Sequence, residues 1–194
     1  MVDRYGSFAE LAAENTEGVE YRIRVTDRGS PVLILAPHGG TIEPETAEIA
    51  EAIAGDDLSF YAFEALQPGA FGDFHITSHK FDEPRALEIV EQSSLAVAIH
   101  GRRDDGTDKV WIGGRAREAG NAISAALEEA GYGAERNKRL PGLHETNICN
   151  RTKTGAGVQL ELSRTMRRHL AAHPAALDAF AIAVRAGIAA VTPT

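Results

Sequence analysis

Two histidines and one glutamate have the types and spacing of a metal site. His38 follows the apolar run PVLILA, and Glu43 comes five residues later. His100 ends a second apolar run, SLAVAIH. Zinc in a hydrolase usually takes three side chains of histidine and carboxylate type and leaves a fourth position for water. The three residues therefore predict such a zinc site, with Gly39 and Gly40 letting the backbone turn so that His38 and Glu43 aim at one point.

Each of these residues also has an ordinary structural interpretation. A histidine beside two glycines could belong to a turn, and Glu43, next to Pro44, could favour a helix start through the helix dipole. The sequence HGG also occurs in the oxyanion loop of serine esterases. That interpretation lacks its nucleophile, because the chain contains no G-x-S-x-G.

Glu161 is the candidate catalytic base. It lies in the strand-like stretch VQLEL, where Gln159 and Glu161 share one face because side chains alternate along a strand. A buried carboxylate needs a metal, a catalytic role or a salt bridge to offset the loss of water. As a base it would take a proton from water and pass it to the leaving nitrogen of an amide. The alternative is an ion pair with Arg164 or Arg167.

Several polar residues are candidates for holding the substrate. Arg102 and Arg164 follow the strands that carry His100 and Glu161, while Asn150 and Arg151 lie in the segment NICNRTKTG. The guanidinium fork of arginine binds both oxygens of a carboxylate or stabilises an oxyanion. Asparagine could donate hydrogen bonds to the substrate or shape a turn.

His75 and His79 are four residues apart in HITSHKFD. The intervening residues favour extended backbone, which would separate the two side chains by ~13 Å, so both could not bind one ion. We assign His79 a contact with substrate and His75 a structural role.

The composition is that of a soluble globular protein, and we expect one domain spanning residues 1–194. The formal net charge of −8 argues against nucleic acid as a partner. No basic stretch followed by an apolar run begins the chain, and no apolar stretch is long enough to span a membrane. A single cysteine excludes an intrachain disulfide. We expect a cytoplasmic monomer.

Strand-like and helix-like segments alternate along the chain, which predicts a three-layer α/β fold. The sheet is expected to be open, mixed and mainly parallel, with helices on both faces. Ligands of such sheets gather beyond the carboxyl ends of the strands, where His38 and His100 lie. The predicted strands are 20–26, 31–36, 58–65, 75–78, 94–100, 109–114 and 157–163. The predicted helices are 7–15, 44–54, one from about 84, 115–130 and one or two within 164–191. Residues 133–156 are expected to be mostly loop.

The stretches PHGGTIEPETAEIAEAI, FHITSHKFDEPRAL, VAIHG and NICNRTKTGAGVQLELSRTMR resemble the poly-γ-glutamate hydrolase family of phages and bacteria. The resemblance runs from about residue 32 to 168. It implies a carboxypeptidase-like core, zinc (Zn2+) on His38, Glu43 and His100, and Glu161 as the base. It also implies a γ-linked glutamyl polymer as substrate, with no nucleotide or redox cofactor.

Two alternatives remain at the level of the sequence. The same metal site could serve a deacylase or peptidase acting on an N-acyl amino acid or a cell-wall peptide. The chain could also be a non-catalytic metal-binding protein, in which case a structural zinc would have four protein ligands.

Overall fold

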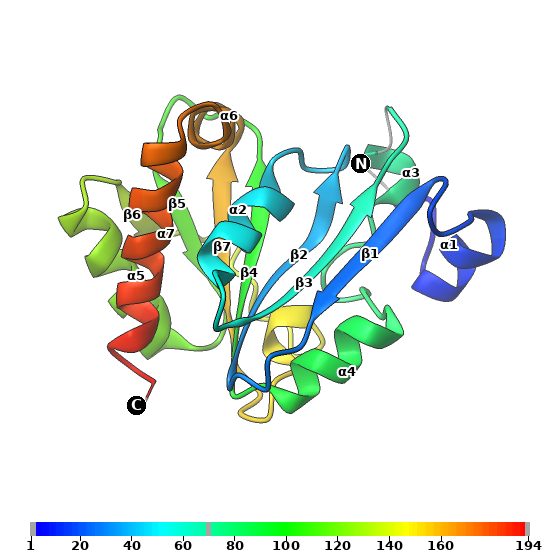
Figure 1. The fold of residues 1–194 in the computed structure, drawn as a ribbon, viewed down its shortest axis with the longest axis horizontal. Coiled ribbons are helices and arrows are strands. Elements are labelled where there is room, and N and C mark those ends of the chain that lie inside the picture. Colours follow the sequence, from blue (N-terminus) through cyan, green and yellow to red (C-terminus); the bar gives the residue numbers. More distant parts are fainter. Residues whose placement is uncertain (1–2, 69–70, 193–194) are drawn as a thin grey trace.

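The structure is a computed structural model that describes residues 3–68 and 71–192. Its strands form one seven-stranded mixed sheet in the order β1-β3-β2-β4-β7-β5-β6 (Figure 1). The strands β3, β2, β4 and β7 are parallel neighbours, whereas β1 and β5 run antiparallel to β3 and β7. The strands are β1 (Tyr21–Thr26), β2 (Val32–Gly40), β3 (Ser59–Ala65), β4 (Leu95–Arg102), β5 (Val110–Gly113), β6 (Ala134–Arg136) and β7 (Val158–Ser163).

Helices cover both faces of this sheet (Figure 1). One apolar cluster joins the sheet to α2, α5, α6 and α7, and a second joins the opposite face to α1, α4 and η1. Alternation along the strands supplies both, since Ile34 belongs to the first cluster and Leu33 and Leu35 to the second. The predicted three-layer fold is confirmed. The helices are α1 (Phe8–Glu14), α2 (Thr46–Ala54), α3 (Phe71–Phe74), α4 (Pro84–Gln92), α5 (Arg117–Glu129), α6 (Arg164–Ala172), α7 (Pro174–Ala189) and the 3-10 helix η1 (Ile148–Asn150).

The structure differs from the sequence-based assignment in a few short segments. The strand expected at 31–36 continues to Gly40, because Gly39 and Gly40 pair with β3 after an irregularity in the ladder. The extended segment predicted at 75–78 joins no strand of the described sheet. The short α3 and β6 have too few residues to show a periodic pattern. Within the described residues, no helix combines the length and apolar character that a membrane crossing requires.

Candidate active site

Three neighbouring strands bring His38, His100 and Glu161 to one part of the sheet. His38 lies near the carboxyl end of β2, His100 near that of β4, and Glu161 on β7. His100 and Glu161 are register partners across the β4–β7 ladder. All three side chains are buried. The parallel central strands therefore converge imidazole and carboxylate groups at the carboxyl edge of the sheet, where ligands of such sheets bind.

The two glycines after His38 allow the chain to double back toward it. Gly40 has a left-handed backbone (φ 64°), and a Cβ atom there would overlap the backbone of Ala65. At Gly39 a Cβ atom would lie 2.9 Å from the Ala47 Cβ atom. The Glu43 amide then donates to the carbonyl oxygen of His38 (2.8 Å). This turn fixes His38 and Glu43 beside each other, as their spacing predicts.

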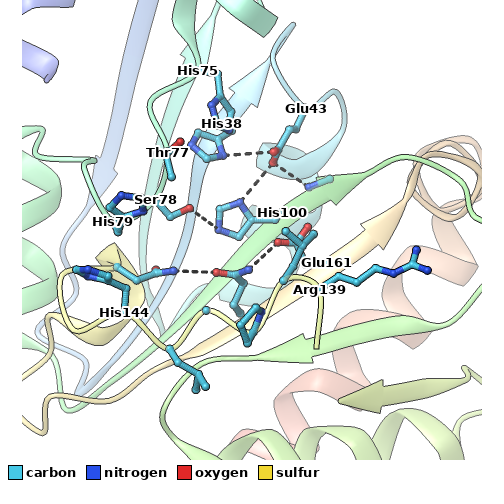
Figure 2. Close-up of a pocket in the computed structure, with 17 residues that line it drawn as sticks. His38, Glu43, His75, Thr77, Ser78, His79, His100, Arg139, His144 and Glu161 are labelled. Atoms are coloured by element: carbon cyan, nitrogen blue, oxygen red, sulfur yellow. Dashed lines mark hydrogen bonds and ion pairs between the residues drawn. The ribbon is translucent and has the colours of Figure 1, made fainter. Parts of the chain in front are cut away.

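Both imidazole rings turn their Nδ1 atoms toward Glu43 (Figure 2). The distances to its carboxylate oxygens are 3.3 Å from His38 and 3.5 Å from His100. His38 Nε2 donates to the carbonyl oxygen of Ile76 (2.8 Å), and His100 Nε2 lies 3.5 Å from the Ser78 hydroxyl. Among the described residues, the buried His38 Nδ1 has no hydrogen-bond partner. The Ile76 carbonyl thus fixes His38 Nε2 in the manner usual for metal-binding histidines, while Nδ1 faces Glu43.

A third imidazole, that of His75, borders the same cluster. Its ring centroid lies 4.2 Å from that of His38, and His38, Glu43 and His75 offer ligand atoms within 4.8 Å of one another. The Nδ1 atom of His75 is bonded to the Asp3 carboxylate (2.8 Å). The spacing of His75 and His79 argues against one ion shared by these two, whereas the structure brings His75 beside His38.

Three ionisable groups at the centre have opposed pKa shifts. Burial raises the pKa of Glu161, and the negative charge of Glu43 adds to this increase. Burial opposes ionisation of Glu43 as well, but the charge of His38 and the contacts with both histidines hold its pKa well below the usual range. Burial lowers the pKa of His100 and Glu43 raises it, with a net increase. Glu43 is thus kept as an anion, whereas Glu161 can hold a proton, a division of roles typical of acid–base sites.

A short chain of amides orients Glu161. The Gln159 Nε2 atom donates to Glu161 Oε1 (2.6 Å), and Asn147 Nδ2 donates to Gln159 Oε1 (3.0 Å). Within the described part of the chain Glu161 forms no ion pair, since Arg167 instead donates to the carbonyl oxygen of Pro44. The salt-bridge interpretation of Glu161 therefore has no support in the structure.

These groups open into a cavity of about 460 Å³. The predicted substrate contact His79 lines it, with its ring centroid 5.0 Å from that of His144. Of the described residues that line the cavity, Arg139 is the one arginine, and its position in the expected loop 133–156 carried no sequence signal. Asn147, the first residue of the segment NICNRTKTG, also lines it.

The structure does not bring the predicted Arg102 to this cavity. Its guanidinium lies 4.1 Å from the Trp111 ring centroid and pairs with Asp105 (2.8 Å). It also donates to the carbonyl oxygen of Lys109 (2.7 Å). Arg102 is two residues beyond His100, so alternation alone would place both side chains on the same face of β4. Contacts with the β4–β5 connection hold Arg102 away from the cavity instead. Arg102 is thus a structural residue of that loop.

Asn150, Arg151 and Arg164 likewise do not line the cavity. Asn150 is buried and donates to the carbonyl oxygens of Gly142 and His144, so it shapes the loop that forms one wall. Arg151 donates to a backbone carbonyl within the same segment, and Arg164 is exposed at the start of α6. Asn150 therefore acts on the cavity through the backbone, and a direct substrate contact by any of the three has no support in the structure.

Comparison with known proteins places these features in context. Residues 5–177 match the poly-gamma-glutamate hydrolase family. The SPbeta prophage-derived UPF0714 protein YoqZ of Bacillus subtilis (strain 168) is 42% identical over 172 residues, which are 87% of this chain and 61% of YoqZ. This chain thus spans less than two thirds of the length of that relative.

Two solved structures share the fold closely. The structure of a bacteriophage poly-gamma-glutamate hydrolase superposes with a TM-score of 0.91 at 30% identity, covering 97% of this chain and 98% of the other. A zinc-free structure of YNDL superposes with a TM-score of 0.80 at 34% identity, covering 87% and 83%. The carboxypeptidase-like architecture implied by the sequence resemblance is confirmed.

Proposed function

Because this chain belongs to the poly-γ-glutamate hydrolase family, we propose that it hydrolyses γ-glutamyl amide bonds with the help of a zinc ion. The observation that carries the proposal is the buried pair of Nδ1 atoms, on His38 and His100, that face the Glu43 carboxylate beside Glu161. Folded proteins rarely leave a buried polar atom without a hydrogen-bond partner. Among the described residues His38 Nδ1 is such an atom, and a bound metal ion would supply the partner.

The donor set fits zinc. His38, Glu43 and His100 would hold the ion through two neutral imidazoles and one carboxylate, the ligands typical of catalytic zinc. His75 stands beside them as a competing third imidazole. When bound, the ion would polarise the scissile carbonyl and make water more acidic. The zinc-free form named for YNDL supports the choice of metal.

Glu161 is the proposed proton carrier. Its carboxylate takes a proton from the attacking water and delivers it to the nitrogen of the departing γ-glutamyl amide, which becomes an amine. The raised pKa favours both steps, because the group can hold the proton between them. The 2.6 Å hydrogen bond from Gln159 restrains Oε1, so the carboxylate is held in one orientation.

Arg139 is the proposed contact with substrate. Each residue of a γ-linked glutamate chain keeps its α-carboxylate, so carboxylates flank every scissile bond. Arg139 is exposed at the cavity and forms no ion pair within the described residues. Its guanidinium is therefore available to bind an α-carboxylate of the polymer. His79 also lines the cavity and remains a predicted contact.

Depolymerisation of γ-linked and α-linked polyglutamate, followed by size-exclusion chromatography, tests this proposal. We expect shortening of the γ-linked polymer alone, loss of activity with a chelator and recovery with added zinc. Cleavage of N-acyl amino acids or cell-wall peptides in place of the polymer would favour the alternative substrate. Full activity in the chelated protein would refute the role of the metal.

A further inference from the structure

A second cavity of about 460 Å³ lies beside the candidate active site. Pro141 and Leu143 line both cavities, so the segment that contains them forms the wall between the two. The far side of this wall carries Arg117, Arg136 and Lys138. The two cavities therefore form adjoining compartments that an extended ligand can occupy together.

The second cavity is strongly basic although the chain as a whole is acidic. The formal net charge is −8, yet none of the described residues that line this cavity is acidic. Neither Arg117 nor Lys138 forms an ion pair with another described residue. Arg136 is steadied by hydrogen bonds to Asn121 Oδ1 (3.2 Å) and to the carbonyl oxygen of Arg117 (3.0 Å). Clustered cations without carboxylate partners create a local positive potential that attracts anions.

The wall between the cavities exposes apolar side chains. Leu140, which is 41% exposed, lines the first cavity together with Arg139, and Leu143, which is 51% exposed, lines both cavities, the second together with Lys138. A γ-linked glutamate chain has two methylene groups in each main-chain repeat and a free α-carboxylate on each residue. Its alternation of apolar and anionic groups matches a surface that offers Arg139 in the first cavity, the apolar Pro141 and Leu143 shared by both cavities, and the cations of the second cavity.

We propose that Arg117, Arg136 and Lys138 form a distal subsite that binds α-carboxylates of the polymer away from the cleaved bond. This inference rests on the proposed function and extends it to chain length. The distal subsite favours long polymers over short γ-glutamyl peptides, which fill only the first cavity. The positive end of α5, which begins at Arg117 without a side-chain cap, adds to the attraction for anions.

Binding of labelled γ-glutamyl oligomers, measured by fluorescence anisotropy, tests the distal subsite without requiring turnover. The test variant is Arg117→Gln/Lys138→Gln, which leaves the hydrogen-bonded Arg136 in place. The control is Arg103→Gln/Arg168→Gln, which removes the same charge from exposed residues that line neither cavity. Each protein is titrated with a γ-glutamyl dipeptide and with an oligomer of about 20 residues, at low and moderate salt.

We expect the test variant to bind the long oligomer about 10-fold more weakly, which corresponds to about 1.4 kcal/mol, with a shallower salt dependence. Dipeptide binding, and all binding by the control, should stay within about twofold of the unaltered protein. Equal weakening in the control, equal weakening for the dipeptide, or no binding of the long oligomer by the unaltered protein would each overturn the distal subsite. If the unaltered protein binds the long oligomer tightly, the test variant binds it weakly and neither cleaves it, the proposed hydrolysis would be refuted and the distal subsite would be supported.

Discussion

Replacing Glu161 with glutamine removes the proposed proton carrier while keeping its shape. A positioned general base contributes about 10²–10⁴-fold to a rate. Within the described residues that line the cavity, the other carboxylate is that of Glu43, which is engaged by His38, His100 and the amide of Gly101. Among the described lining residues no other carboxylate is free to substitute, so we expect kcat to fall by about 10³–10⁴, or about 4–5.5 kcal/mol at 1.36 kcal/mol per tenfold.

The fold should tolerate this substitution. The side chain of Glu161 is 5% exposed, and a glutamine there can still accept the hydrogen bond from Gln159. Loss of the charge-assisted bond is partly offset because an uncharged amide costs less to bury. We therefore expect the free energy of unfolding to change by no more than about 1 kcal/mol, and bound zinc to be retained.

The assay is kcat on γ-linked polyglutamate together with zinc content and chemical denaturation. Glu83→Gln is a matched control, because Glu83 is a buried carboxylate outside the cavity that accepts hydrogen bonds from Tyr61 and the amide of Ala86. It should lower stability and leave kcat unchanged. A kcat for Glu161→Gln within about threefold of the parent, with zinc bound, would refute the assigned role.

Two further predictions concern the structure that supports the site. Gly40→Ala forces an alanine into a left-handed backbone conformation, which costs about 1–2 kcal/mol before its overlap with the Ala65 backbone is counted. The Tm of thermal unfolding and the zinc content should therefore both decrease, and an unchanged Tm would contradict the turn geometry. Glu64 is buried, and although burial opposes its ionisation, hydrogen bonds from Arg22 and Arg24 lower its pKa. A carboxylate whose pKa is lowered in the folded state stabilises the fold above its unfolded pKa, and this stabilisation is lost as the pH falls through the folded pKa. Glu64→Gln should therefore lower the free energy of unfolding by about 1–2 kcal/mol at pH 7 and by progressively less below about pH 4, as measured by denaturant titration. A loss of stability that does not depend on pH would contradict this.

The sequence predicted the parts of the site that depend on strand pattern. Apolar runs located β2 and β4, and the alternation in β7 correctly placed Gln159 and Glu161 on one face. These features are local, because a strand fixes its side-chain directions every second residue. The register of His100 opposite Glu161 agrees with the predicted convergence.

Contacts between distant loops were outside the reach of the sequence. His75 meets His38 only because the loop after α3 folds over β2, and its partner Asp3 is 72 positions away. Arg102 was expected to contact substrate because it follows a strand end, but Trp111 and Asp105 hold it instead. Such pairings depend on loop closure in three dimensions and leave no periodic pattern in the chain.

A crystal structure of the zinc-loaded protein, with anomalous scattering recorded at the zinc edge, would show which side chains bind the ion. We expect a single zinc about 2.0–2.2 Å from His38 Nδ1, His100 Nδ1 and a Glu43 oxygen, with a fourth ligand that is not a protein side chain. Zinc bound to His38, Glu43 and His75 with His100 apart, or a fourth protein ligand closing the site, would contradict the proposed centre.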